Sequence, residues 1–219
     1  FKIIKQGLSN KLINGPINKT KTLRKKHLGM TEYVAKNFNQ KKFAMLIYND
    51  SLSVCPITTH LPIKLVSKKI TKKLIKEKIT IINRFYINIL GFKPTIGVVG
   101  LNPHCESVLE FNEDTKIILP TVKLLRKRGI KISGPYPSDT IFMKNNIKKF
   151  DVIVGMYHDQ VLTPIKTLYG FNAINITLGL PFLRITPDHG TNNVMIGKNL
   201  SSPTSLIEAI LFSKNISDY

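Results

Sequence analysis

The stretch DVIVGMYHDQVLTPIKT, residues 151–167, is the part of the sequence that decides the fold. Its apolar run Val152–Met156 predicts a buried strand, since a short continuous run of this kind is typical of a strand covered on both faces. The run ends at His158 and Asp159, and Lys166 follows within the same stretch. Because ligand sites of open α/β sheets form at the carboxyl ends of strands, these residues indicate a site where the strand leaves the core.

Strand-like and helix-like segments alternate along the rest of the chain. Apolar runs bounded by turn residues predict further strands at 43–49, 52–58, 95–102 and 172–179. Apolar residues at three- and four-residue spacing predict helices within 61–90, at 114–128 and at 202–214. The segment 133–140, rich in Gly and Pro, reads as a loop that contains Asp139. Such alternation predicts the α/β class with a largely parallel sheet.

Composition restricts the classes of protein to which the chain can belong. Its 219 residues are 42% hydrophobic, which is enough for a sizeable core, and no apolar run approaches the ~20 residues of a membrane span. The net charge is +20, but the lysines are scattered among Ile, Leu and Asn rather than interleaved with aromatic residues. We therefore expect neither a nucleic-acid partner nor a membrane, although a diffuse positive field would attract a phosphorylated substrate. Two cysteines form no disulfide framework, which favours a reducing cytoplasm.

Four of the five histidines come directly after strand-like segments. They are His60, His104, His158 and His189. Three neutral imidazoles with an open position suit a catalytic divalent metal. No local spacing groups these histidines, so from the residues alone a metal site and separate, structurally packed histidines remain alternatives. Asp159 is equally open, as a partner that orients a ligand or as a residue that caps the loop.

The remaining candidates are polar residues near the same strand ends. Lys166 and Arg184 flank the predicted strand that contains Asn175, and converging cations would hold a phosphate or a carboxylate. The alternatives are a surface lysine and a structural amide with a hydrogen-bond partner. No GxGxxG sequence follows a strand, so the dinucleotide fingerprint of the Rossmann fold is absent from the sequence.

Eight short motifs together resemble those of the PdxA family, the 4-hydroxythreonine-4-phosphate dehydrogenases. In chain order they are GPINK (15–19), GMTEY (29–33), TTHLP (58–62), GLNPH (100–104), GPYPSDT (134–140), MYHDQ (156–160), NITLGLPFLR (175–184) and DHGT (188–191). The resemblance spans nearly all of residues 1–219, with no internal domain boundary evident. It implies an α/β/α architecture like that of isocitrate and isopropylmalate dehydrogenases, with the N-terminal part missing.

The resemblance also implies an activity. Family members use NAD or NADP and a divalent metal (Zn, Mg or Co) to oxidise 4-phosphooxy-L-threonine. The 3-oxo acid then loses CO2 to give 3-amino-2-oxopropyl phosphate, in the biosynthesis of pyridoxal phosphate (vitamin B6). Members are homodimers with the site at the subunit interface. The same likeness makes this chain a cytoplasmic oxidoreductase that acts on a phosphorylated small molecule.

Matching motif to motif assigns roles to individual residues. The implied metal ligands are His60, His104 and His158. The implied substrate-binding residues are Thr31, Lys166, Asn175 and Arg184. The DHGT loop resembles a loop that holds the adenosine part of the cofactor in the isopropylmalate enzymes, which implies cofactor contacts at His189 and Gly190. Asp139 and Asp159 are the implied catalytic carboxylates, each able to tune a ligand or to relay a proton.

Two departures from the family pattern keep other hypotheses open. Met30 stands where the family usually has a substrate-contacting His, and Met cannot donate or accept comparable hydrogen bonds. The first residues of the chain also match an internal part of the family sequence, just before the GPINK motif, so that an N-terminal part of the family pattern is missing. The alternatives are therefore a dehydrogenase of a related phosphorylated hydroxy acid, such as threonate or erythronate 4-phosphate, and a non-catalytic fragment. A basic nucleic-acid-binding protein is a further alternative, against which the retained histidines, Lys166 and Arg184 argue.

Overall fold

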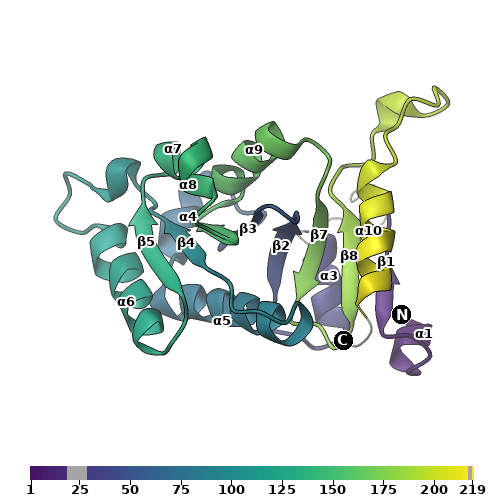
Figure 1. The fold of residues 1–219 in the computed structure, drawn as a ribbon, viewed down its shortest axis with the longest axis horizontal. Coiled ribbons are helices and arrows are strands. Elements are labelled where there is room, and N and C mark those ends of the chain that lie inside the picture. Colours follow the sequence, from purple (N-terminus) through teal and green to yellow (C-terminus); the bar gives the residue numbers. More distant parts are fainter. Residues whose placement is uncertain (19–28, 217–218) are drawn as a thin grey trace. The chain divides into compact units, whose positions relative to one another are not determined.

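The computed structural model describes residues 1–18, 29–216 and 219, so His27 lies outside the described residues. The chain folds as two compact units (Figure 1). Unit 1 consists of Phe1–Asn49 and Tyr169–Tyr219, and unit 2 consists of Asp50–Leu168. The sequence analysis placed no boundary within the chain, whereas the structure divides it after residues 49 and 168.

Unit 2 contains four parallel strands in the order β3, β6, β4, β5. Their bounds are β3 Ser53–Pro56, β4 Ile96–Val99, β5 Ile132–Tyr136 and β6 Val152–Gly155. Every residue of β3, β4 and β6 is buried, which explains why the sequence shows continuous apolar runs there instead of alternation. The α/β class and the largely parallel pairing predicted from the sequence are confirmed.

The helices of unit 2 account for the amphipathic segments of the sequence. They are η1 Ile63–Leu65, α4 Val66–Lys69, α5 Lys72–Ile89, η2 Pro103–Cys105, η3 Asp114–Ile118, α6 Leu119–Lys127, α7 Ser138–Ile141, α8 Lys144–Ile147 and α9 His158–Tyr169. Helix α5 begins where the Thr71 hydroxyl accepts a hydrogen bond from the Leu74 amide at 3.2 Å. In the view of Figure 1, α5 runs below these strands and α7, α8 and α9 lie above them.

Strand β5 was not predicted from the sequence, because residues 133–140 were expected to form a loop. Gly134 and Pro135 are strand residues at the edge of the β3–β6–β4–β5 order, where a proline costs no ladder hydrogen bond. A side chain at Gly134 would come within 2.4 Å of the Val98 carbonyl oxygen on β4. Glycine therefore permits the close approach of these two strands.

Unit 1 mixes strand directions. Its strands are β1 Lys11–Ile13, β2 Ala44–Tyr48, β7 Ile174–Leu178 and β8 Leu183–Pro187. Strand β8 pairs in parallel with β1 and antiparallel with β7, and β7 pairs antiparallel with β2. The helices of this unit are α1 Lys2–Lys5, α3 Met30–Asn37, η4 Asn193–Met195 and α10 Thr204–Asn215. Antiparallel pairing lets β7 and β8 follow each other through a short connection at 179–182.

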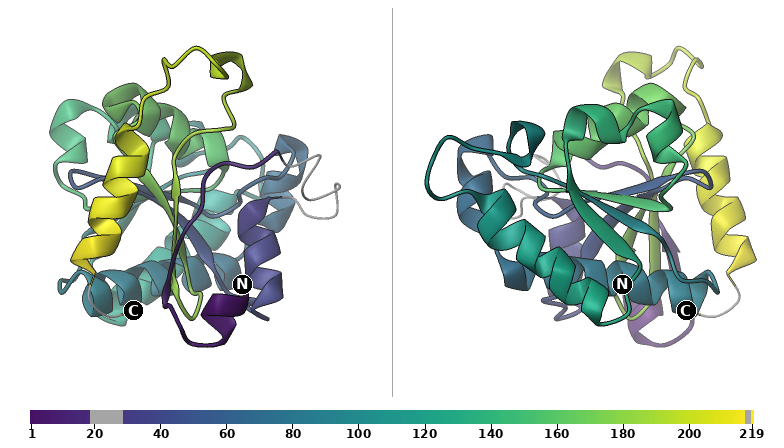
Figure 2. Two further views of the ribbon diagram at one scale, coloured as in Figure 1. Left: turned by 90° about the vertical axis from the view of Figure 1, so that its right-hand side faces the viewer. Right: turned by 60° about the vertical axis from the view of Figure 1, so that its left-hand side comes forward.

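Helix α10 packs on its sheet through small residues. Ser205, Ala209 and Ser213, four residues apart, are buried against the strands, with α10 lying alongside β7 and β8 (Figure 2, left). The larger aliphatic side chains point away from the sheet and are 42–50% exposed, namely Leu206, Ile207, Ile210 and Leu211. The small face sets how closely α10 approaches the sheet.

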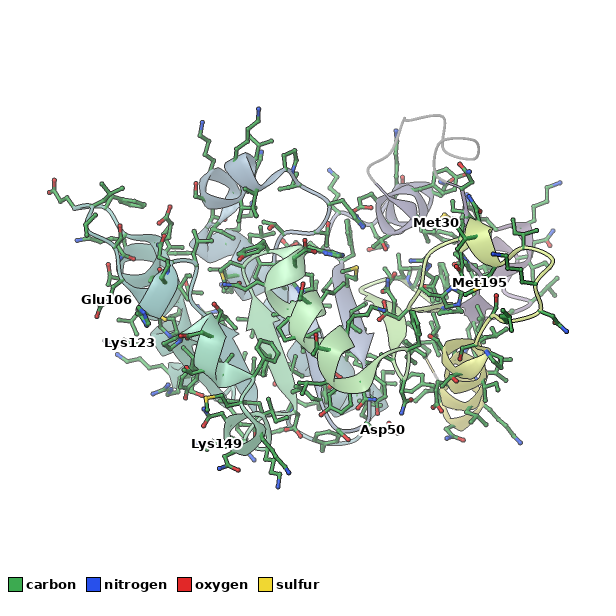
Figure 3. All side chains as sticks on the ribbon, turned by 90° about the horizontal axis from the view of Figure 1, so that it is seen from above. Met30, Asp50, Glu106, Lys123, Lys149 and Met195 are labelled. Atoms are coloured by element: carbon green, nitrogen blue, oxygen red, sulfur yellow. The ribbon has the colours of Figure 1, made fainter. Side chains whose placement is uncertain are left out.

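Part of the positive charge of the described residues lies on solvated faces. Lys123 on α6 and Lys149 after α8 are exposed, and Figure 3 shows both at the periphery of unit 2. None of the helices within the described ranges is both long enough and apolar enough to cross a membrane.

We predict that Ala209→Leu destabilises the protein, because Ala209 is fully buried between α10 and the sheet. Overpacking of this kind costs about 1–3 kcal/mol of unfolding free energy. Ile210→Leu, on the exposed face, is the matched control and should change that free energy by less than about 0.5 kcal/mol. Urea unfolding followed by circular dichroism measures both. Equal stability of the two variants would show that α10 does not pack through its small face.

Candidate metal and substrate site

His60 and His158 lie together beyond the carboxyl ends of β3 and β6. Their ring centroids are 5.7 Å apart. The two loops are joined at Met156, whose carbonyl oxygen accepts hydrogen bonds from the Thr58 amide at 3.1 Å and from the Thr58 hydroxyl at 2.7 Å. Each histidine follows this joint by two residues, which explains why the rings meet although 98 residues separate them in sequence.

A carboxylate fixes the orientation of the His158 ring. Asp159 Oδ1 lies 2.6 Å from His158 Nδ1, which leaves Nε2 as the nitrogen for a metal. A carboxylate behind a histidine is the usual arrangement in metal sites, where it selects the tautomer and strengthens the ligand. Both rings are partly exposed, so an ion can reach them. The donor set therefore suits a divalent metal, to which His60 and His158 would contribute two imidazoles.

His104 lies on the loop after β4, in the short helix η2. Its φ of 55° and the φ of 63° at Cys105 are both in the left-handed region, which non-glycine residues rarely adopt. Among the residues that the structure describes, no three His, Cys, Asp or Glu side chains are grouped closely enough to hold an ion. The structure thus brings together two of the three predicted ligands and does not place His104 with them.

Cys105 beside His104 remains a protonated thiol at neutral pH. Burial and the nearby Asp114 carboxylate raise its pKa to about 11, and Asp139 adds a smaller effect in the same direction. Since only the thiolate binds metals or attacks substrates readily, Cys105 acts as a packed side chain. The contribution of Asp139 also places that exposed carboxylate, on α7, within electrostatic range of the His104 loop.

Lys166 is farther from the histidine pair than the sequence suggests. It lies on α9, which begins at His158, so eight residues of helix separate the two. At 1.5 Å per residue this is about 12 Å along the helix axis. Lys166 is half-buried, and it can serve a charged group at a distance from the histidine pair, not one bound directly to it.

In unit 1, Arg184 is a buried cation that donates three hydrogen bonds to neutral oxygen atoms. Its side chain is 2% exposed. Nε donates to Asn14 Oδ1 at 3.0 Å, and Nη1 donates to Thr177 Oγ1 at 2.7 Å and to Thr31 Oγ1 at 3.2 Å. Burial lowers the pKa of Arg184 to about 10, while the charge of Glu32 partly opposes this shift. Arg184 therefore stays positively charged at neutral pH.

Asn175 lies on the same face of the sheet as Thr177, two residues along β7. In the pairing of β7 with β8, Thr177 lies opposite Arg184 and Asn175 lies opposite Thr186. The Oδ1 atom of Asn175 is buried and has no hydrogen-bond partner among the described residues. An unpaired buried amide oxygen is costly, and this atom could accept a hydrogen bond from a bound molecule.

Met30, labelled in Figure 3, is the first residue of α3 and precedes Thr31. Its half-buried side chain packs against the apolar cluster that contains Val34, Leu180 and Phe182. Methionine therefore contributes packing at a position where a histidine would be a polar contact.

A pocket of about 530 Å³ lies in unit 1 around the DHGT loop. His189 and Gly190 line it together with Phe171, Met195, Ser201 and Ser202. The rings of His189 and Phe171 meet edge to face with centroids 6.4 Å apart. The base of the loop is held by Ser205, whose hydroxyl accepts from the Asp188 amide at 2.8 Å. Aromatic and hydroxyl groups of this kind suit a flat heterocycle with polar substituents.

Four polar residues of these sites were missed by the sequence analysis. They are Asn14, Asp114, Gln160 and Thr177. Thr177 is two residues from Asn175 on the same predicted strand, so the sequence already indicated that the two side chains share one face of the sheet. The other three act through hydrogen bonds to partners 12 to 170 residues away, which local sequence does not reveal.

The predicted site residues divide between the units. His60, His104, Asp139, His158, Asp159 and Lys166 belong to unit 2, and Thr31, Asn175, Arg184, His189 and Gly190 belong to unit 1.

Comparison with known proteins gives a consistent result. The family model described as "Pyridoxal phosphate biosynthetic protein PdxA" matches residues 1–213. A 4-hydroxythreonine-4-phosphate dehydrogenase of Sulfurihydrogenibium sp. is 47% identical over 186 residues, which are 84% of this chain and 57% of the relative. One from Aquifex aeolicus is 37% identical over 210 residues, 94% of this chain and 65% of the relative.

The crystal structure of a 4-hydroxythreonine-4-phosphate dehydrogenase from Klebsiella pneumoniae superimposes with a TM-score of 0.80 and 32% identity, covering 97% of this chain and 67% of that one. The chain spans 57% and 65% of the two curated relatives. With its motifs, its fold and a family match over nearly its whole length, the chain belongs to the PdxA family.

Proposed function

We propose that the protein acts in pyridoxal phosphate biosynthesis as a metal-dependent, NAD(P)-linked 4-hydroxythreonine-4-phosphate dehydrogenase. In this reaction 4-phosphooxy-L-threonine is oxidised, and the resulting 3-oxo acid loses CO2 to give 3-amino-2-oxopropyl phosphate. The observation that carries the proposal is the facing pair His60 and His158 at the ends of two parallel strands in a PdxA-family chain. The same membership supports a homodimer, with the site at the subunit interface, in the cytoplasm.

The metal ligands in this proposal are His60, His104 and His158. A divalent metal (Zn, Mg or Co) bound there would supply Lewis acidity that lowers the pKa of the substrate hydroxyl. Asp159 holds Nδ1 of His158 and so keeps Nε2 directed outward. Asp139 is exposed on α7 near the His104 loop, and we assign it the role of accepting the hydroxyl proton.

The anionic groups of the substrate are assigned to the cationic and amide residues. Arg184, preorganised by its bonds to Thr31 and Thr177, presents a fixed positive charge to a phosphate or carboxylate. Asn175 offers its buried Oδ1 to a hydroxyl or ammonium donor. Lys166 serves the end of the substrate remote from the metal ligands.

The pocket around His189 and Gly190 is assigned to the adenosine part of NAD or NADP. The nicotinamide accepts the hydride, which is the chemistry that the cofactor supplies.

A second candidate is a dehydrogenase of threonate or erythronate 4-phosphate, and Met30 is the observation that favours it. Its thioether packs in the apolar cluster of α3 and offers no hydrogen bond comparable to that of the usual His. A pocket with this change discriminates less strongly for the amino group of phosphooxythreonine.

The direct test is an assay of reduced nicotinamide formation by the protein at its full natural length. The substrates are 4-phosphooxy-L-threonine, threonate 4-phosphate and erythronate 4-phosphate, each with NAD or NADP, before and after chelation of metal. We expect turnover of phosphooxythreonine that chelation abolishes and added Zn, Mg or Co restores. Turnover only of the other two phosphates would favour the second candidate. A folded, metal-loaded chain that turns over none of the three would contradict both.

We predict that His158→Ala abolishes tight binding of Zn²⁺, because it removes one ring of the facing pair. His189→Ala, which removes a histidine from the pocket of unit 1, is the control and should retain the wild-type stoichiometry. Isothermal titration calorimetry on metal-free protein measures both. Stoichiometric Zn²⁺ on the His158→Ala chain would exclude His158 as a ligand.

We predict that Arg184→Lys raises the KM for the phosphorylated substrate more than tenfold. Lysine keeps the charge but loses the planar fork that bonds Asn14, Thr31 and Thr177, and a hydrogen bond to a charged group contributes about 1.5–3 kcal/mol. Arg126→Lys, which loses an Nε bond to the Ile132 carbonyl on unit 2, should leave KM unchanged. Steady-state kinetics at neutral pH decides, and an unaltered KM for Arg184→Lys would remove Arg184 from the substrate site.

A further inference from the structure

The side chain of Gln160 bridges the ends of two neighbouring strands. It is 8% exposed. Its Oε1 accepts a hydrogen bond from the Met156 amide at 2.6 Å, and its Nε2 donates to the Gly100 carbonyl at 2.7 Å. The register of β4 and β6 ends at Val98 and Val154, so the Gln160 amide joins the residues two positions farther along each chain. The Gln160 side chain therefore connects the two strands just beyond the last backbone pairing of β4 and β6.

Asp114 holds the next two residues of the β4 loop. Its carboxylate is fully buried. Oδ1 accepts from the Leu101 amide at 2.7 Å, and Oδ2 accepts from the amide and the side-chain nitrogen of Asn102 at 3.1 and 2.9 Å. Asp114 itself is fixed by Asn112, whose Oδ1 accepts from the Asp114 amide at 2.8 Å. Gln160 and Asp114 together therefore bind three consecutive residues, Gly100 to Asn102.

Two glycines make room for these side chains. A Cβ at Gly100 would lie 2.6 Å from Asp114 Oδ1 and 2.6 Å from Cys105 Sγ. A Cβ at Gly155 would lie 3.1 Å from Gln160 Oε1 and 2.5 Å from Val161 Cγ1. Both strand ends are thus built for the close approach of a polar group.

The loop that follows carries His104 and is conformationally unfavourable by itself. His104 and Cys105 are consecutive non-glycine residues with left-handed backbone. Such residues persist only where the surroundings determine their conformation. The bonds from Gln160 and Asp114 to residues 100–102 constrain the start of this loop, and the Glu113 carboxylate also accepts from the Asn102 side chain at 3.2 Å.

The same amide also reaches the loop of the histidine pair. Met156, which donates to Gln160, accepts the two hydrogen bonds from Thr58 that join the His60 loop to the His158 loop. One side chain thus connects the backbone before His104 to the joint before His60 and His158. Both polar atoms of this buried amide are therefore paired, one with each strand end.

We propose that Gln160 and Asp114 are positioning residues that fix the start of the His104 loop, residues 100–102, to the Met156 joint from which the His60 and His158 loops leave. They touch neither metal nor substrate and act through the backbone of residues 100–102. The inference rests on one part of the proposed function, namely that His60, His104 and His158 bind the same metal ion. Partners of this kind typically change metal affinity by about 10- to 100-fold.

The test uses Gln160→Glu, which keeps the size of the side chain and an oxygen for the Met156 amide but removes the donor to Gly100. We expect Co²⁺ affinity to fall at least tenfold, with a changed visible absorption spectrum as one nitrogen ligand is lost. In metal-free protein, amide hydrogen exchange at residues 100–106 should become faster. Gln40→Glu is the matched control, since Gln40 donates to the Phe38 carbonyl in unit 1 and should alter neither readout.

A double variant separates positioning from general damage. In a His104→Ala background, Gln160→Glu should cause no further loss of Co²⁺ affinity, because the ligand that it positions is already gone. An equal loss in both backgrounds would overturn the proposal, as would unchanged affinity and exchange in Gln160→Glu. Asp114→Asn should likewise speed exchange at Leu101 and Asn102, and unchanged exchange there would remove Asp114 from the proposal.

If the wild-type chain binds no Co²⁺, the metal site of the proposed function fails. Hydrogen exchange in metal-free protein then still decides whether Gln160 and Asp114 hold the loop. Exchange that is unaffected by either substitution overturns their positioning role independently of the metal.

Discussion

The buried backbone N–H and C=O groups of Met156 form the joint on which the candidate metal site of unit 2 depends. The carbonyl accepts two hydrogen bonds from Thr58, and the amide donates to Gln160. Leaving such groups buried and unpaired would be costly, so the strand ends cannot separate without a large penalty. The loops after β3 and β6 leave the sheet from this joint. The positions of His60 and His158 therefore follow from hydrogen bonds to the Met156 backbone and do not depend on the histidines themselves.

Unit 1 depends in a similar way on Arg184. Burying a guanidinium among neutral oxygens is expensive, and a well-packed apolar side chain would often be more stable at such a position. The cation is nonetheless held by Asn14 just after β1, by Thr31 on α3 and by Thr177 on β7, and its pKa of about 10 keeps it charged. In the proposed function, this preorganised cation is assigned to an anionic group of the substrate, such as its phosphate.

Much of the fold was predictable because the buried strands of unit 2 are apolar throughout and therefore visible as continuous runs. Strand β5 was not, since Gly134 and Pro135 read as loop residues until the neighbouring strand β4 is known. The candidate site residues were found from motifs, but their geometry was not. Lys166 is about 12 Å along α9 from His158, because the residues between them are helical. The roles of Gln160 and Asn14 depend on partners 60 and 170 residues away.

The proposed function requires His60, His104 and His158 to bind one divalent metal, although the structure brings only His60 and His158 together. X-ray absorption spectroscopy of the Zn²⁺-loaded chain tests this most directly, because Cys105 adjoins His104. The account predicts imidazole scattering from three rings, with Zn–N distances of about 2.0–2.1 Å. A sulfur shell at about 2.3 Å, or fewer than three imidazoles, would contradict it.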